Sequence, residues 1–295
     1  LIAPMALFLL AACGGNPLGG GDDGGGTPPP TPVTDVPIEV AENLRAISYD
    51  PAAGTLTVSI DNPGASPLNA AFTRAPGLDV DGYQAFVYQE TGLLRSHLAL
   101  VAENPRGNLQ AAAVSDGGQF NYRFGGGSFV RVDTFTAPTT GVFSYTGSYA
   151  GVFVPGESSN LALPPSFQAS TPYRTRGDIL MTGSFTSNIV EGGITNRELL
   201  DDDGNVVTTV TLEPVTLKNT AIDSDGRFLG EVEFAGGPGE VIGNYAGAFG
   251  GTGATDIAGA LVINPIQGEN GIWEFGVWNL PACGTAGEGP LCALQ

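Results

Sequence analysis

The sequence predicts an all-β protein: an eight-stranded antiparallel up-and-down β-barrel preceded by a smaller β-rich subdomain. Three observations support this prediction. Glycine accounts for 45 and proline for 22 of the 295 residues. Apolar residues alternate in short runs instead of recurring at helical spacing. Clusters of Asp, Asn, Gly and Pro, which are typical of turns, separate these runs. We therefore expect many short strands and no long helix.

The first residues carry the pattern of a bacterial lipoprotein signal. An apolar run at 7–10 leads into Leu10-Ala11-Ala12-Cys13, a lipobox in which the cysteine becomes the lipid-bearing first residue of the mature protein. A buried core cysteine is the alternative, but residues 14–32 are almost wholly Gly, Pro, Asp, Thr and Asn and offer too little apolar surface to fold. We expect residues 1–12 to be a signal remnant and residues 13–35 a lipidated, disordered tether.

Gly14 follows the predicted lipidated cysteine and bears on the location of the protein. The overall charge limits the classes of partner. Gly14, rather than Asp, is typical of lipoproteins sorted to the outer membrane, which leaves surface and periplasmic display both open. The formal net charge is −19, and Lys218 is the one lysine. A nucleic-acid partner is disfavoured because no Arg/Lys cluster is available to neutralise phosphates. The expected partner is the membrane, through the lipid on Cys13, and the acidic surface mainly serves solubility.

We assign residues 36–138 to the smaller subdomain, which we call the handle. Turn clusters such as 50–54, 61–64, 79–82 and 116–118 punctuate it. Three successive glycines at 125–127 mark a bulge or a close approach of another backbone. The predicted strands are Ala46–Tyr49, Thr55–Ile60, Tyr83–Tyr88, His97–Ala102, Asn108–Val114 and Gln119–Phe124.

Residues 139–295 predict the barrel, because the strands lengthen and alternate more sharply from Gly141 onward. In Arg227–Phe234 the apolar residues face one way and Arg227, Glu231 and Glu233 the other, as in an antiparallel strand with one face on a core and one in water. Turn clusters at 201–205 and 223–226 mark hairpins. About eight such runs close most simply into a barrel filled by side chains, which removes exposed edges. The same-face apolar sets are Phe143, Tyr145, Tyr149 and Phe153; Val206, Val210 and Leu212; Phe228, Val232 and Phe234; and Trp273, Phe275 and Val277.

Two cysteines besides Cys13 lie near the C-terminus. Cys283 and Cys292 are joined by a short flexible stretch, and an oxidising compartment would pair them. Two cysteines alone do not make a structural zinc site, and the only histidine, His97, lies far away in the sequence. We therefore predict a disulfide and no metal site.

A search for catalytic patterns gives weak candidates. A Ser-His-Asp catalytic triad would have to use His97, and the sequence has no Gly-x-Ser-x-Gly motif to supply the nucleophile. Three Asp-x-Asp-Gly stretches lack ligands at calcium-loop spacing and are predicted to be turns. The glycines of 247–259 have no accompanying lysine of a phosphate loop. Glu231 and Glu233 share a strand face, as glycosidase carboxylates could, but an exposed strand face explains them more simply. We expect no enzyme activity and no cofactor.

Residues 247–259, Gly-Ala-Phe-Gly-Gly-Thr-Gly-Ala-Thr-Asp-Ile-Ala-Gly, resemble the G-x-F-Y-G-P-x-A-x-E-hydrophobic-G-G segment of transferrin-binding-protein-B-type β-barrel lipoproteins. Gly247, Phe249, Gly251, Ala254 and Gly259 fall in register, whereas Gly250, Thr252, Asp256 and Ala258 depart from the pattern. Residues 145–151 and 177–197 are similar to the earlier strands of that barrel. The resemblance covers roughly residues 140–280. It implies a handle beside a barrel on a lipid tether, with room for a single such lobe.

The resemblance implies a non-catalytic binding module for a protein or a haem or iron-type ligand, without naming the ligand. His97 and Tyr149 are of the types that ligate haem, but their positions alone assign neither. The alternatives are a structural envelope lipoprotein without a soluble ligand and a hydrolase that uses acidic residues. A membrane-embedded barrel fits poorly, because Glu231 and Glu233 would face lipid.

Overall fold

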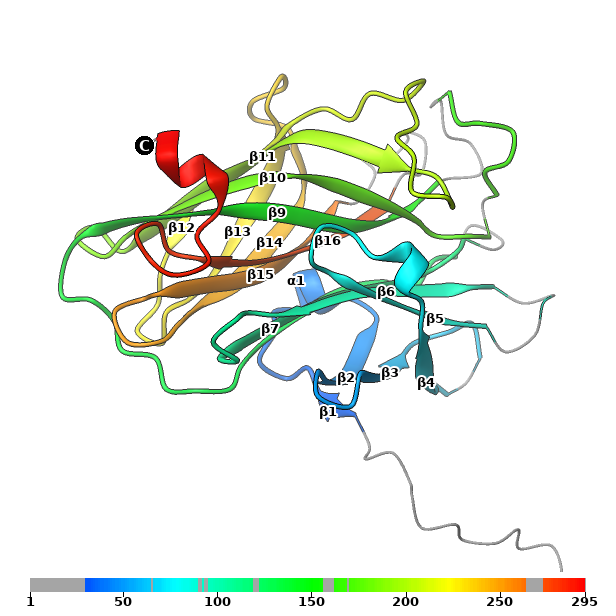
Figure 1. The fold of residues 1–295 in the computed structure, drawn as a ribbon, viewed down its shortest axis with the longest axis horizontal. Helices are drawn as coiled ribbons and strands as arrows, with labels where there is room; N and C mark the ends of the chain where they lie inside the picture. The colour runs from blue at the N-terminus through cyan, green and yellow to red at the C-terminus, as the bar shows by residue number, and fades with distance from the viewer. Residues whose placement is uncertain are drawn as a thin grey trace, which may run out of the picture.

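The computed structural model describes residues 30–64, 66–89, 92, 95–118, 122–155, 162–168, 170–263 and 273–294. They form two antiparallel sheets, an eight-stranded curled sheet and a closed eight-stranded barrel (Figure 1). The predicted all-β class and the up-and-down barrel are confirmed. Within these residues no helix is both long and apolar enough for a membrane crossing.

The curled sheet, which we call the half-barrel, pairs its strands in chain order, so that β1 and β8 are its two edges. The short helix α1 (Ile38–Ala41) follows β1, and a 3₁₀ turn, η1 (Pro76–Leu78), precedes β5. The strands are β1 (Thr31–Pro32), β2 (Leu44–Asp50), β3 (Thr55–Ile60), β4 (Leu68–Arg74), β5 (Gln84–Tyr88), β6 (His97–Glu103), β7 (Leu109–Asp116) and β8 (Gly125–Arg131).

The barrel also pairs its strands in chain order and closes where β16 pairs with β9, from Trp273 opposite Val154 to Trp278 opposite Tyr149. No edge remains within it, as the alternation predicts. The strands are β9 (Val142–Val154), β10 (Tyr173–Ser184), β11 (Ile189–Leu200), β12 (Val215–Ala221), β13 (Arg227–Phe234), β14 (Val241–Gly250), β15 (Asp256–Ile263) and β16 (Trp273–Pro281).

Large side chains fill the barrel. Tyr145 and Tyr149 are fully buried, as expected for same-face residues of β9. The ring of Phe249 is central: its centroid lies 5.0 Å from that of Phe185 and 5.6 Å from those of Tyr145 and Phe228. Ring pairs at such separations stabilise a core beyond the area that they bury.

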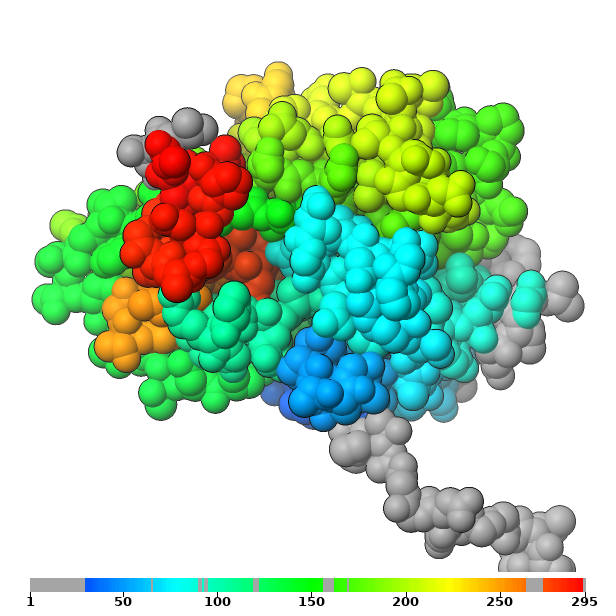
Figure 2. Space-filling view, viewed as in Figure 1, coloured from blue at the N-terminus to red at the C-terminus, as the bar shows by residue number. Residues whose placement is uncertain are grey.

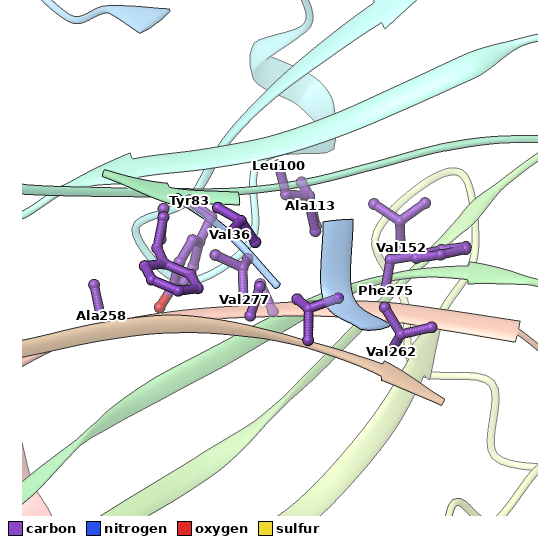
Figure 3. Packing of buried hydrophobic residues seen from close by; sticks show 14 of the residues in the cluster. Val36, Tyr83, Leu100, Ala113, Val152, Ala258, Val262, Phe275 and Val277 are labelled. Carbon is purple, nitrogen blue, oxygen red and sulfur yellow. The ribbon is translucent and has the colours of Figure 1, made fainter. Parts of the chain in front are cut away.

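The half-barrel covers the outer face of one side of the barrel. Phe275 and Val277 of β16, together with Val152 and Val262, pack against Leu100 and other half-barrel side chains (Figure 3). The predicted alternation of β16 is correct, but its apolar set faces the half-barrel, and the opposite face, with Trp278, fills the barrel. The expectation that one face meets water is therefore wrong here. All eight residues of β15 are buried, because both of its faces are covered.

Three glycines allow this contact. A Cβ added at Gly125 would lie 2.3 Å from the Phe275 ring, one at Gly126 would lie 1.9 Å from the carbonyl oxygen of Ala41, and one at Gly127 would lie 2.4 Å from the Cβ of Ala260. The close approach predicted at these glycines is confirmed. They lie within the regular strand β8, which pairs with β7 without a bulge.

Two strand predictions are wrong within the described residues. The strand expected at 119–124 begins only at Gly125, and residues 119–121 lie outside the described residues. Val206–Leu212 is a loop, and β12 begins at Val215. No strand is predicted at β4, where Ala70 and Ala71 weaken the apolar contrast. The hairpin turn at 223–226 is confirmed: the carboxylate of Asp223 accepts hydrogen bonds from the backbone N–H groups of Asp225 and Arg227, each at 2.8 Å.

A disulfide joins Cys283 and Cys292, nine residues apart, and holds the C-terminal segment against the barrel (Figure 2). The 3₁₀ helix η2 (Pro290–Leu294) carries Cys292, whose sulfur lies 3.1 Å from the Thr146 hydroxyl of β9.

Replacing both cysteines of this disulfide with serine is expected to lower the free energy of unfolding by about 2 to 3 kcal/mol, because the unfolded chain regains the entropy of a short closed loop. Denaturant unfolding of the parent and of the Cys283→Ser/Cys292→Ser variant measures the loss. Adding a reductant should destabilise the parent and leave the variant unchanged. Equal stability of the two proteins under oxidising conditions would contradict a stabilising role.

Candidate functional site

An open groove lies along the seam of the half-barrel, between β2 and β8, where the curled sheet does not close. The groove has a volume of about 240 Å³ and exposes more apolar than polar surface. Its lining residues come from β1, β2, β6, β7 and the end of β8: Thr31, Ile47, Ser48, Tyr49, Val101, Gln110, Ala111, Ala112, Ser128, Val130 and Val132. Ile47, Val101 and Ala112 also belong to the core of the half-barrel, so the groove is an opening into that core.

The two strand edges beside the groove differ. β1 is two residues long and contains Pro32, which has no backbone N–H, so it offers little to a further strand. β8 is seven residues long and lies at the end of the sheet. Five of its seven residues, 125–129, are buried and α1 packs against it, so the protein itself covers most of this edge.

A buried hydroxyl lies in the groove. Ser128 is 1% exposed, and its Oγ has no hydrogen-bond partner among the described residues. Leaving a buried hydroxyl unpaired costs free energy, and a ligand that pairs with it recovers that cost.

One rim of the groove is acidic. The Gln110 amide donates a hydrogen bond of 2.7 Å to Glu103, which lies beside Tyr49. Burial, together with the negative charges of Glu103 and Asp50, raises the pKa of the Tyr49 hydroxyl. The tyrosine ring therefore stands at the boundary between the apolar floor and the acidic rim.

A second polar cluster lies where β6 begins and β7 ends. His97 pairs with Asp116 across these strands and packs its ring against Phe72 and Tyr88. Arg95 forms an ion pair with Asp116, whose carboxylate also accepts a 2.9 Å hydrogen bond from the backbone N–H of Phe124. Burial raises the pKa of Asp116 to about 7. Burial, reinforced by the nearby Arg95, lowers the pKa of His97 to about 4.

These two shifts have opposite effects on stability. Between pH 4 and 6.5 the folded chain binds fewer protons at His97 than the unfolded chain does, so this histidine favours folding more as the pH rises. Between pH 3.8 and 7 the folded chain binds more protons at Asp116, so this carboxyl favours folding less as the pH rises. Around pH 5 to 6 the changes in stability with pH that these two groups cause nearly cancel.

We expect His97→Gln to remove the pH-dependent contribution of the histidine to stability and to leave that of Asp116. The difference in free energy of unfolding between the parent and the variant should shift by about 2 kcal/mol between pH 7 and pH 5, with the parent losing more on acidification. Denaturant unfolding at pH 5, 6 and 7 measures it, and His97 is the chain's only histidine. Parallel curves for the two proteins would show that the pKa of His97 is not lowered by folding.

A third polar cluster is buried inside the barrel. Glu274 of β16 accepts hydrogen bonds from the hydroxyls of Tyr149, at 2.7 Å, and Thr175, at 2.8 Å. Arg197 of β11 forms an ion pair with the same carboxylate, and the two side chains are only 3% and 2% exposed. A Cβ at Gly276 would lie 2.0 Å from the Tyr149 hydroxyl, so this glycine makes room for the tyrosine.

The remaining candidates from the sequence lie apart from one another. Tyr149 is in the barrel and His97 in the half-barrel, so the two potential haem ligands do not share a site. Glu231 and Glu233 both form ion pairs with Lys218, at 2.9 and 2.8 Å. The hydrogen bond from Lys218 lowers the pKa of Glu233. A glycosidase acid needs a raised pKa instead. Cys13 lies outside the described residues.

Sequence reasoning missed the groove. Its walls are β2 and β8, about eighty positions apart in the chain, and no local pattern indicates that they approach each other without pairing. The only local signal was Ser128, a polar residue at a core-facing position of its strand.

Comparison with known proteins identifies structures rather than sequence relatives. No model of a protein family matches the sequence, and no curated protein matches it. Among solved structures, a double mutant of transferrin binding protein B from Haemophilus parasuis Hp5 matches 81% of this chain and 45% of its own, at 13% identity and a TM-score of 0.40. The isotype 1 protein from serogroup B Neisseria meningitidis matches 81% of this chain and 52% of its own, at 12% identity and a TM-score of 0.36.

Intact Ap-TbpB, with its N and C lobes, matches 79% of this chain and 54% of its own, at 13% identity and a TM-score of 0.36. The chain spans about half the length of each of these proteins. This chain is similar in fold to these structures of transferrin binding protein B.

Proposed function

We propose that this chain is a lipid-anchored, non-catalytic binding module of the outer membrane that takes a protein ligand in the groove of its half-barrel. The observation that carries the proposal is the groove itself, an opening into an apolar core that is lined by a buried hydroxyl with no hydrogen-bond partner among the described residues. Residues 36–138 form the ligand-binding handle and residues 139–295 the supporting barrel.

The interior of the barrel supports the assignment of ligand binding to the handle. Its centre is occupied by aromatic rings and by the Glu274–Arg197 ion pair, so its interior serves as a rigid core. The carboxylates of Glu231 and Glu233 are bridged by Lys218, whose hydrogen bond lowers the pKa of Glu233. This arrangement favours binding over acid-base catalysis.

A capture experiment tests the binding role. The mature chain, residues 13–295 with Cys13→Ser, would be immobilised and exposed to extracellular fluid and to a haem and siderophore panel. Val132 lines the groove and is 56% exposed, so Val132→Lys places a charge there without disturbing the core. Val142, which is 65% exposed at the start of β9, gives the matched control Val142→Lys.

We expect a saturable protein ligand that the parent and Val142→Lys retain and that Val132→Lys loses. Capture unaffected by Val132→Lys would remove the groove from the binding site. Failure of the parent to capture any ligand under several conditions would favour a structural envelope role.

The anchor has a separate test. Intact-protein mass spectrometry of the membrane-extracted chain should show a protein that begins at Cys13 and carries the mass of attached acyl chains, because the lipobox directs cleavage before the cysteine. Cys13→Ser should abolish both the acyl mass and membrane association. A membrane-bound Cys13→Ser protein would show that attachment does not depend on this residue.

A further inference from the structure

We propose that the C-terminal loop from Cys283 to Cys292 binds Zn²⁺ when its disulfide is reduced, with Glu288 as the third protein ligand. In the oxidised protein the disulfide occupies both sulfurs. Reduction frees them beside a carboxylate, and two thiolates with one carboxylate are donors of the types that Zn²⁺ prefers. The same two cysteines are then cross-linked either by their own bond or by a metal ion.

The fold brings the three ligand atoms together. The sulfurs of Cys283 and Cys292 and a carboxylate oxygen of Glu288 all lie within 4.8 Å of one another. Zn–S bonds of about 2.3 Å place two sulfurs of a tetrahedral site about 3.8 Å apart, which is the scale of this cluster. Among the described residues no other three His, Cys, Asp or Glu side chains place their ligand atoms this close. Two cysteines alone do not indicate a zinc site, and the third ligand is recognisable only in the folded loop.

Hydrogen bonds hold the loop in shape independently of the disulfide. The backbone N–H of Cys283 donates a 2.8 Å hydrogen bond to the carbonyl of Ser144, which anchors the start of the loop to β9. Two successive turns follow, in which the N–H of Thr285 donates to the carbonyl of Ala282 at 3.1 Å and the N–H of Glu288 donates to the carbonyl of Thr285 at 3.2 Å. Reduction therefore leaves both thiols and the carboxylate on one short folded loop.

The carboxylate of Glu288 is held next to the first cysteine. Its Oε2 accepts a 2.5 Å hydrogen bond from the backbone N–H of Gly284, the residue after Cys283. Gly284 has a φ of 81°, a conformation that favours glycine. Glu288 is exposed and the two cysteines are half-buried, so a reductant and a metal ion can reach them from solvent at the surface of the molecule (Figure 2).

Thr146 of β9 supports the second cysteine. Its hydroxyl lies 3.1 Å from the sulfur of Cys292, and Thr146 is fully buried. A metal-bound thiolate has no proton, so the hydroxyl is placed to donate a hydrogen bond to it, and bonds of this kind orient metal ligands. A Cβ at Gly289 would lie 2.5 Å from the carbonyl oxygen of Thr146, so the chain just before η2 packs closely against β9.

Reduction and metal binding are two separate steps. A thiol reductant breaks the bond between the two sulfurs by exchange: both cysteines become thiols, and two thiol groups of the reductant are oxidised to a disulfide. Zn²⁺ then binds the two thiolates and displaces their two protons to solvent. The net charge of −19 favours the approach of a cation.

A cobalt titration tests the site, because Co²⁺ held by thiolates absorbs visible light and Zn²⁺ does not. The mature chain with Cys13→Ser is reduced with dithiothreitol, freed of reductant under argon, checked for folding by circular dichroism, and titrated with Co²⁺ and then with Zn²⁺. We expect one Co²⁺ per reduced chain, displaced by Zn²⁺, which thiolate ligands favour. The chain that is left oxidised should show no thiolate–cobalt absorption.

Matched variants assign the ligands. Glu288→Gln should weaken Co²⁺ binding by at least about tenfold, because it removes a charged ligand. Glu240→Gln removes the same charge from an exposed position at the opposite end of β14–β16 and should leave the affinity unchanged. Cys283→Ser/Cys292→Ser should abolish the thiolate–cobalt absorption.

Three results would overturn the proposal. Equal affinities of Glu288→Gln and Glu240→Gln would show that two thiols bind the metal without the carboxylate. The same absorption from the oxidised chain would show that the metal does not depend on reduction of the disulfide. A folded, reduced chain that gives no saturable thiolate–cobalt absorption below about 1 mM Co²⁺ would show that the loop is not a metal site.

Discussion

Replacing Arg197 with methionine is expected to lower the free energy of unfolding by about 3 to 5 kcal/mol, because it leaves a charged carboxylate buried without its partner. The carboxylate is that of Glu274, which is 2% exposed inside the barrel. Tyr149 and Thr175 would still donate hydrogen bonds to it, but neither supplies a positive charge. Denaturant unfolding at pH 7, followed by circular dichroism, measures the loss.

A surface ion pair on the same barrel provides the control. Arg176 and Glu198 pair between β10 and β11, with side chains that are 37% and 40% exposed. Arg176→Met should therefore change stability by no more than about 1 kcal/mol. The double variant Arg197→Met/Glu274→Gln should recover part of the loss, because no buried charge remains. If Arg197→Met costs no more than Arg176→Met, the central ion pair does not stabilise the barrel.

Replacing Gly126 with valine is expected to cost about 3 kcal/mol or more, the upper range for overpacking a closed site. Any side chain at this position meets the backbone of α1, since a Cβ would lie 1.9 Å from the carbonyl oxygen of Ala41. α1 and β8 would have to separate. Thermal unfolding and exposure of apolar surface to a hydrophobic dye would report the change.

Gly77 gives the matched control for this substitution. It lies in η1 with an ordinary backbone angle, and a Cβ there would have no neighbour within 4 Å. Gly77→Val should therefore change stability by less than about 1 kcal/mol. Equal stability of the two variants would contradict the view that Gly126 is required for the close packing of β8 against α1.

The sequence predicts the barrel well because its strands alternate strongly. Tyr145 and Tyr149 recur at even spacing, and a two-residue period places them on one face regardless of what that face contacts. The same period does not reveal which face is covered. Phe275 and Val277 alternate correctly yet pack outward, because the half-barrel supplies a second apolar surface that no local pattern indicates.

The weaker predictions share a different cause. Glycines are unfavourable in strands, so the glycines at 125–127 indicate a bulge or a close approach, and no strand is predicted where β8 runs continuously. The packing partners of these glycines, Ala41 and Ala260, lie far away in the sequence. The groove depends in the same way on contacts between distant strands. The fold could therefore be predicted from the sequence, but the candidate site could not.

Hydrogen exchange of the mature chain with its captured ligand would test the central claim, that the seam of the half-barrel is the binding surface, most directly. We predict slower exchange on ligand binding at residues 125–132 and at the facing residues 44–50, with the barrel strands β10–β13 unchanged. Protection confined to the barrel, with 125–132 exchanging as in the free protein, would contradict it.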